Sequence, residues 1–264
     1  MAVFTDLSET DCAEIANVFR LGHLTSVIGI ADGDRETTFL FRAEHGEFIV
    51  TLFETGAEPA DLEQAFRTME KLATAGVPCP TTRRTDMDAA TVTVSGKLVA
   101  VVSFVPGSPV NEVTPARCRA LGACAARIHQ TLARPRGIVR ADLPRGAVHG
   151  ALNRDNVFFL GEAVSGVINF RLRHDDLIVS ELAQLLVSWT ARTDGMLEEC
   201  LAAALMHGYE DVRMLSAAER RALPAFVMAA TASSLAENDR LDEIEANALR
   251  AFLSVRVGFG VGSS

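Results

Sequence analysis

The stretch that decides the fold is Val148–Phe170, VHGALNRDNVFFLGEAVSGVINF. It contains two apolar runs, Val157–Leu160 and a second that ends at Phe170, separated by a Gly-Glu turn. Two short apolar runs around a glycine turn predict a β-hairpin. A polar loop precedes this hairpin, and an asparagine stands at its far end. The stretch therefore predicts polar side chains gathered at the open end of a hairpin.

The bulk composition indicates a soluble globular protein. The chain has 264 residues, of which 48% are hydrophobic and 22% are charged. That length suffices for one large domain or two lobes with a real core. The formal net charge of -9 argues against a general nucleic-acid surface or an anionic-membrane surface. A local basic pocket stays compatible with this charge.

Cysteine usage, together with the absence of a signal peptide pattern and of an apolar run long enough to span a membrane, predicts a cytoplasmic location. The five cysteines are scattered, odd in number and lack a C-x-x-C pair, so we interpret them as buried thiols in a reducing compartment. The N-terminus lacks the basic-then-apolar pattern of a signal peptide. The longest apolar run, Leu98–Val105, is too short to span a bilayer.

The first 105 residues predict a β-rich lobe. A helix is expected after the capping residue Ser8, and an amphipathic helix is expected over Asp61–Thr74. Alternating apolar residues and turn signals predict five strands. These strands are Leu24–Ile30, Thr37–Arg42, Glu47–Phe53, Thr91–Val94 and Lys97–Val105.

The remainder predicts a mainly helical lobe. Residues 106–110 begin with Pro-Gly-Ser-Pro, a convincing hinge, and Thr114-Pro115 then starts a helix. We therefore expect an N-lobe over 1–105, a hinge over 106–110, a C-lobe over 111–257 and a frayed tail over 258–264. The last four predicted helices are Ser180–Ala191, Met196–Tyr209, Ala217–Glu237 and Asp242–Val255.

The segment between the first two strands, Gly29–Glu36, has two open interpretations. A glycine-containing loop between strands can close over phosphates through its backbone N–H groups. An ordinary surface turn explains the two glycines equally well. Asp32, Asp34 and Glu36 make the loop acidic, which does not favour an anionic ligand.

Several motifs together resemble a known family. A β-rich lobe, a Pro-Gly hinge and a helical lobe with an H-x-D-x-x-x-x-N-like loop and a D-F-like pair resemble the protein-kinase plan. Within it, the chain is most similar to the aminoglycoside-phosphotransferase/choline-kinase superfamily and to its bacterial homoserine kinase branch. The motifs that carry this resemblance include Gly29–Gly33, Phe48–Glu54, Gly76–Pro80, Arg154–Val157 and Ser165–Phe170.

The resemblance implies an α+β, two-lobed, aminoglycoside phosphotransferase-like fold. It also implies ATP and Mg²⁺ as cofactors, with phosphoryl transfer to the hydroxyl of a small amino alcohol. Asn156 and Asn169 would be the metal ligands. The nucleotide contacts that it implies are Gly29, Ala31, Gly33, Thr51, Phe104 and Asn156.

The departures from the family pattern fall on the chemistry. The family's catalytic Asp corresponds to Ala151, which cannot accept a proton, and its metal-binding Asp corresponds to Asn169. Thr51 stands where many kinases carry a phosphate-pairing lysine, although the homoserine kinase branch lacks that lysine too. Only Gln130–Val148 lies where relatives carry a longer, acceptor-binding helical insert.

Other polar residues near the loop have mainly structural interpretations. His149 is more typical of a structural loop residue than of a catalyst. Asp155 is an ionisable residue that would have to replace the missing base, but a capping role fits the family plan better. We expect Glu181 to brace the loop. Asp175 and Asp176 are expected as solvated loop charges, and Trp189 and Tyr209 as core or interface residues.

These residues lead to three hypotheses. The first is a pseudokinase, a binding or regulatory module that retains some affinity for a nucleotide and engages a protein partner. The second is a weakly active or repurposed small-molecule kinase, nominally homoserine kinase. The third is a non-catalytic subunit of a larger assembly. General-base catalysis alone contributes about 10²–10⁴ in rate, so losing it together with a metal carboxylate favours the first hypothesis.

Overall fold

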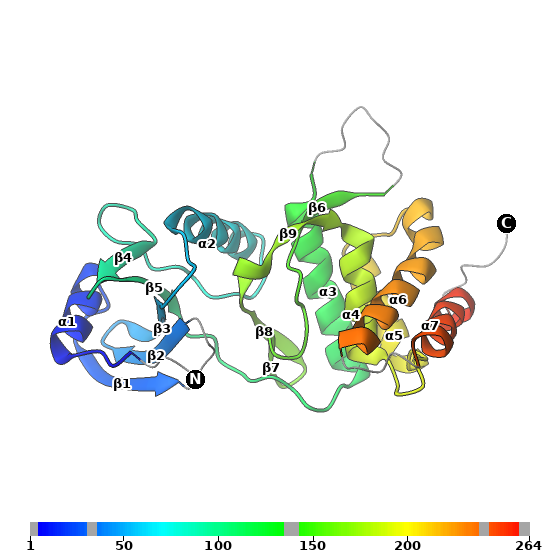
Figure 1. Ribbon diagram of the computed structural model, residues 1–264, viewed down its shortest axis with the longest axis horizontal. Helices are drawn as coiled ribbons and strands as arrows, with labels where there is room; N and C mark the ends of the chain where they lie inside the picture. Colours follow the sequence, from blue (N-terminus) through cyan, green and yellow to red (C-terminus); the bar gives the residue numbers. More distant parts are fainter. Residues whose placement is uncertain (1–4, 31–35, 135–142, 238–242, 259–264) are drawn as a thin grey trace. The chain divides into compact units, whose positions relative to one another are not determined.

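The computed structural model describes residues 5–30, 36–134, 143–237 and 243–258 (Figure 1). It separates into two units, each with its own internal contacts. Unit 1 comprises Met1–Thr74 and Cys79–Val105, and unit 2 comprises Ala75–Pro78 and Pro106–Ser264.

Unit 1 is built on a five-stranded antiparallel sheet in the order β1-β2-β3-β5-β4 (Figure 1). Alternate residues of β2 and β3, among them Phe39, Phe41 and Val50, are buried in one cluster with Ile15 and Phe19. The period-two alternation therefore places one face of the sheet against the N-terminal helix. The strands are β1 Leu24–Ile30, β2 Glu36–Ala43, β3 Gly46–Phe53, β4 Thr91–Val94 and β5 Lys97–Ser103.

Local signals fix the first helix and the last hairpin of unit 1. Helix α1, Glu9–Val18, begins at a capping box in which Ser8 and Asp11 bond each other's backbone N–H groups. The β4–β5 turn places Ser95 and Gly96 at φ values of 48° and 78°. Positive φ at both central residues is the geometry of a type I′ turn, whose twist matches that of the flanking strands.

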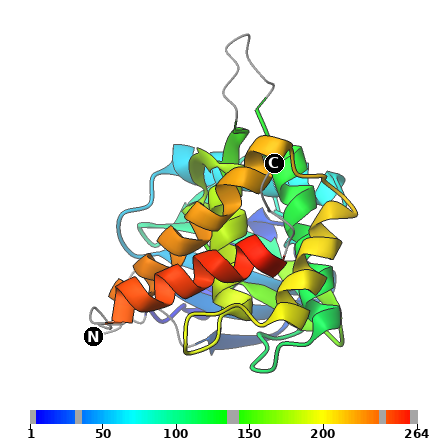
Figure 2. The same cartoon turned by 90° about the vertical axis from the view of Figure 1, so that its right-hand side faces the viewer.

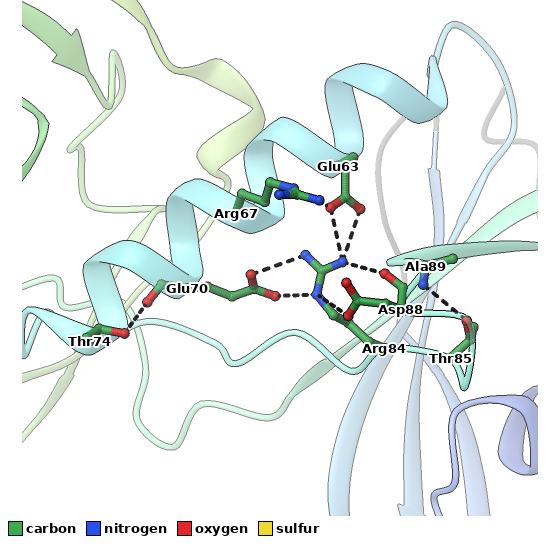
Figure 3. A network of polar contacts seen from close by, with 8 residues as sticks. All are labelled: Glu63, Arg67, Glu70, Thr74, Arg84, Thr85, Asp88 and Ala89. Carbon is green, nitrogen blue, oxygen red and sulfur yellow. Dashed lines mark hydrogen bonds and ion pairs between the residues drawn. The ribbon is translucent and has the colours of Figure 1, made fainter.

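Helix α2, Pro59–Thr74, is tied to the loop before β4 by one arginine (Figure 3). The Arg84 guanidinium donates two hydrogen bonds to Glu70, at 2.7 and 3.1 Å, and Nη1 donates to Glu63 at 3.0 Å. It also donates to the carbonyl of Asp88 at 2.8 Å. Because Arg84 is only 17% exposed, these contacts hold the helix to the loop in a partly dry environment.

Unit 2 is mainly helical, and two of its helices pack at glycines. A Cβ added to Gly122 of α3 (Pro115–Leu132) would lie 2.0 Å from the carbonyl oxygen of Leu205 in α5 (Glu199–Glu210). A Cβ added to Gly208 of α5 would lie 2.0 Å from the carbonyl oxygen of Arg119. The two backbones approach this closely only because neither residue has a side chain.

The helices of unit 2 agree with the sequence-predicted segments to within a few residues. Their bounds are α3 Pro115–Leu132, α4 Ile178–Thr190, α5 Glu199–Glu210, α6 Ala217–Glu237 and α7 Ile244–Gly258, with a short 3₁₀ helix, η1, at Phe170–Leu172. Helix α7 lies alongside α6 (Figure 2). It includes Gly258, the first residue of the predicted tail, and residues 259–264 lie outside the described part of the chain.

Unit 2 also contains two antiparallel strand pairs next to the loop that carries Ala151. The predicted hairpin is present as β7 Val157–Leu160 and β8 Ala163–Val167. A second pair joins β6 Arg145–Val148 to β9 His174–Leu177. The prediction that Asp175 and Asp176 lie in a loop is wrong, because both belong to β9. Each strand of this pair has four residues and no apolar alternation, so the sequence carries no signal for it.

Trp189 and Tyr209 are both buried in unit 2, at 1% and 0% exposure. The indole Nε1 of Trp189 donates to the carbonyl of Leu152 at 2.7 Å. Within the described residues, no helix combines the length and the apolarity needed to cross a membrane.

Candidate functional site

The β7–β8 hairpin brings three of the predicted site positions together. Ile168 N–H donates to the carbonyl of Asn156 at 3.0 Å, so the residues at the open end of the hairpin lie side by side. The side-chain amide of Asn169 donates to Asn156 Oδ1 at 3.5 Å. Asn156 Nδ2 in turn donates to the carbonyl of Ala151 at 3.0 Å. Asn169 has φ 70°, a left-handed conformation that asparagine tolerates better than most residues.

Both ring nitrogens of His149 are used to hold the loop. Nε2 donates to the carbonyl of Ile168 at 2.7 Å, since a carbonyl only accepts. Nδ1 therefore accepts, and its donor is the backbone N–H of Ala151 at 3.2 Å. Burial lowers the pKa of His149, and its ring packs edge-on against Phe170. The imidazole is thus neutral and has no nitrogen left for proton transfer to a ligand.

Glu181 of α4 braces the start of the loop from inside the core. Its carboxylate accepts hydrogen bonds from His129 Nε2 at 2.7 Å, from the backbone N–H of His149 at 3.1 Å and from that of Gly150 at 2.5 Å. Burial acts to raise the pKa of Glu181. The hydrogen bond and charge of His129, with the Gly150 N–H, outweigh burial and hold the pKa below its ordinary value.

A buried polar network extends this brace to three further helices. The second ring nitrogen of His129, in α3, is bonded to the hydroxyl of Tyr209 at 2.8 Å. Arg213 donates to that hydroxyl at 3.0 Å and to Glu219 of α6 at 2.7 Å. The sequence alone did not predict this network. Its one sequence signal is a histidine, His129, on the apolar face of a predicted helix.

Asp155 lies at the surface, outside this buried arrangement. Its side chain is exposed, and its backbone N–H donates to Asn153 Oδ1 at 3.2 Å. That contact forms a local Asx turn, which shapes the loop without using the Asp155 carboxylate. The structure therefore shows a turn at this position and leaves the carboxylate in solvent.

The residues present do not fit a Mg²⁺ ion. Mg²⁺ prefers charged oxygen ligands in an octahedral arrangement. Asn156 and Asn169 supply only neutral amides, and one amide oxygen already accepts from the other side chain. Among the described residues, no group of three or more His, Cys, Asp and Glu side chains is placed to hold a metal ion.

The other candidate nucleotide contacts lie in unit 1. Thr51 is the central member of a row across the sheet, opposite Thr38 of β2 and Ala100 of β5. Gly29 lies in β1 next to the end of that strand, and Phe104, a residue that is 37% exposed, follows β5. Ala31 and Gly33 lie outside the described residues.

The positive charge of unit 1 is largely neutralised within the unit. Lys97, one of only two lysines in the chain, pairs with Glu54 and also contacts Thr5. Burial would raise the pKa of Glu54, but hydrogen bonds from Lys97, Thr37 and Thr5 bring it down to about 2. Residues 1–105 contain 16 acidic and 8 basic residues. This lobe therefore favours cationic over anionic ligands.

Comparison with known proteins identifies the family. The model of the phosphotransferase enzyme family matches residues 26–138. The homoserine kinase of Gluconacetobacter diazotrophicus is 34% identical, over 89% of this chain and 86% of its own length. The chain belongs to the homoserine kinase family. The homoserine kinase of Acidiphilium cryptum is 32% identical, over 85% of this chain and 83% of its own length.

Solved structures show the same fold. An aminoglycoside phosphotransferase from Alicyclobacillus acidocaldarius superposes with a TM-score of 0.68, over 96% of this chain and 97% of that one, at 15% identity. A spectinomycin phosphotransferase solved with ADP and spectinomycin gives a TM-score of 0.58, over 97% and 98% of the two chains, at 10% identity. The family and the fold predicted from the motifs are both confirmed.

Hydrogen bonds at the open end of the β7–β8 hairpin link Ala151, Asn156 and Asn169. Glu181 braces the start of the same loop. The loop is therefore held in place by the fold, and its three linked positions carry uncharged side chains.

Proposed function

We propose that this member of the homoserine kinase family is a non-catalytic binding or regulatory module, a pseudokinase. The observation that carries the proposal is the state of the loop around Ala151. The two buried titratable groups at this loop, His149 and Glu181, are both engaged in hydrogen bonds within the fold. Ala151 itself has no group that accepts a proton from an acceptor hydroxyl.

The rate arithmetic supports an inactive site. A positioned general base contributes about 10²–10⁴ in rate. Phosphoryl transfer also depends on cations that neutralise the charge developing on the phosphoryl oxygens, and neutral amides hold such cations poorly. Losing both contributions leaves little turnover above the uncatalysed reaction.

The lengths of the matched chains are consistent with a reduced acceptor region. The match to the Gluconacetobacter diazotrophicus homoserine kinase spans 278 positions, yet it uses 89% of a chain of 264 residues, about 235 residues. About 40 positions of that relative consequently have no counterpart in this chain. This difference agrees with the short connection between His129 and His149 in the sequence.

One alternative is that the chain is a weakly active kinase, the activity that the names of its relatives state for those proteins. Asp155 is an exposed carboxylate in the same loop as Ala151, and a weakly active ATP-dependent kinase of a small hydroxyl compound would need it as the base. A third hypothesis, a non-catalytic subunit of a larger assembly, makes a different prediction. It requires a protein that co-purifies in a fixed ratio, which native mass spectrometry detects.

Nucleotide binding is tested separately from turnover. We propose that any affinity for ATP is weak, because Thr51 carries no charge and Lys97 is paired with Glu54. A thermal-shift titration with ATP, with and without Mg²⁺, measures this affinity. A stabilisation that appears with ATP alone and is unchanged by Mg²⁺ is the expected result. No shift at about millimolar ATP removes the nucleotide from the proposal, since binding at that level stabilises measurably.

The decisive experiment measures ATP turnover with homoserine. The wild-type chain should show none above background, and so should Asp155→Asn. The double variant Ala151→Asp with Asn169→Asp carries both acidic residues on the same scaffold, so a gain of ATP hydrolysis, with or without homoserine, is expected in it. Wild-type turnover that disappears in Asp155→Asn would overturn the proposal in favour of the weakly active kinase.

A further inference from the structure

Unit 2 contains a cavity of about 370 Å³ beside Ala151. Its walls are the loop residues 150–153, one face of helix α4 and one face of helix α6. Ala151, at the position that corresponds to the family's catalytic Asp, is one of the residues that line this cavity. The cavity therefore lies where a ligand of this loop would sit.

Apart from Glu181, the polar residues that line the cavity are uncharged. Ser180, Gln184 and Ser188 follow one another at intervals of four residues, which places them in a row on one face of α4. Ser233 faces them from α6, and Asn153 from the loop. Hydroxyl and amide side chains both donate and accept hydrogen bonds, as the hydroxyl groups of a ligand do.

The only ionisable side chain among the described lining residues is Glu181. Its carboxylate is 2% exposed and already accepts hydrogen bonds from His129, His149 and Gly150. The Glu181 carboxylate is therefore not available to a ligand as a counter-charge. A charged ligand entering this cavity would give up hydration without an opposite charge to replace it.

The remaining walls are apolar and the volume is small. Leu152, Leu185 and Phe226 supply aliphatic and aromatic surface between the polar groups. Ligand sites in proteins occupy about 300–1,000 Å³, so this cavity belongs at the low end of that range. A mixed apolar and hydroxyl-rich lining of this size suits a compact ring with C–H faces and hydroxyl edges.

We propose that this cavity binds an uncharged polyhydroxylated molecule of about hexose size, a pyranose or a cyclitol. The inference rests on the proposed function, because the molecule is bound at the loop and not phosphorylated there. The proposed ligand also differs in charge from homoserine, the compound in the relatives' names. L-homoserine carries a carboxylate and an ammonium group, and the described lining supplies a counter-charge for neither.

The test uses small polar ligands that differ in charge. D-glucose and myo-inositol are the neutral probes, D-glucosamine the cation, D-glucuronate the anion and L-homoserine the zwitterion. Isothermal titration calorimetry and saturation-transfer NMR on the full chain measure binding. We expect a neutral probe to bind at least about tenfold more tightly than each charged probe. A charged probe that binds as tightly, or no neutral probe bound at about 50 mM, overturns the proposal.

Matched variants locate the binding. Ala230→Phe fills the cavity from α6 and should abolish binding, whereas Ala225→Phe makes the same change at an exposed position outside the lining. Gln184→Leu, at an exposed lining position, should weaken binding about fivefold without unfolding the chain, which circular dichroism checks. Equal affinities in the wild type and Gln184→Leu, or equal losses in the two alanine variants, contradict this location.

Turnover assays on the same samples separate the two proposals. ATP turnover together with binding of a neutral probe rejects the pseudokinase and keeps the ligand class. Absence of both turnover and neutral-probe binding rejects the ligand class and keeps the pseudokinase.

Discussion

Replacing Glu181 by alanine tests the brace on which the loop depends. Its carboxylate accepts three hydrogen bonds at 2% exposure, from His129 Nε2 and from the N–H groups of His149 and Gly150. Glu181→Ala leaves these three donors buried and without that acceptor. We expect this variant to be strongly destabilised in unit 2 while unit 1 is unaffected.

The magnitude follows from two estimates. Hydrogen bonds to a charged group contribute about 1.5–3 kcal/mol each, and removing one partner of a buried ion pair costs about 3–5 kcal/mol. Water that enters the space left by the side chain relieves part of the loss, so we adopt about 3–5 kcal/mol. This is a large fraction of the roughly 5–15 kcal/mol by which a domain is stable.

Trp189 provides the assay. It is the only tryptophan in the chain, it is 1% exposed, and its Nε1 donates to Leu152 in the braced loop. Its fluorescence during urea unfolding therefore reports unit 2. With a slope of about 3 kcal/mol per molar urea, the expected loss lowers the midpoint by about 1–2 M.

A surface carboxylate in the same unit is the control. Asp211 pairs with Arg119 at 2.5 Å, and both side chains are more than half exposed. Asp211→Ala should cost no more than about 1 kcal/mol, because solvent screens such pairs. A loss in Glu181→Ala that is no larger than in this control would show that the brace is not what holds the loop.

Three further predictions concern charge and packing. The pKa of Glu181 is lowered in the folded state, so its contribution is complete above the ordinary value of 4.5 and is lost as the pH falls through the folded-state pKa. The stability difference between wild type and Glu181→Gln should thus be constant above pH 4.5 and shrink below it, and a gap that grows on acidification contradicts this sign. Arg84→Met should cost about 1–3 kcal/mol and lower hydrogen-exchange protection in α2, while Arg67→Met, at a 69% exposed side chain, should change little. Gly208→Ala should cost about 1–3 kcal/mol in the Trp189 unfolding assay, because its Cβ would lie 2.0 Å from a carbonyl of α3, and an unchanged midpoint would mean that the helices separate freely.

The elements of the fold were largely predictable because their signals are local. Capping at Ser8 and Thr114, strand alternation in β2 and β3, and the helical periodicity of α2 each lie within a few consecutive residues. The β6–β9 pair was not predictable from such signals. Its two strands are stabilised by each other across nearly thirty residues of sequence, and neither has an apolar pattern of its own.

For the site, the sequence alone determined which residues stand at the loop positions: Ala151 and Asn169 are visible without any structure. Only the tertiary structure decided what their neighbours do. It engaged both ring nitrogens of His149 in hydrogen bonds, buried Glu181 beside three donors and placed next to Ala151 a cavity lined mainly by uncharged residues. The physical reason is that the sequence itself specifies the identity of each residue. Hydrogen-bond partners, burial and the pKa values that follow from them depend on which distant segments meet.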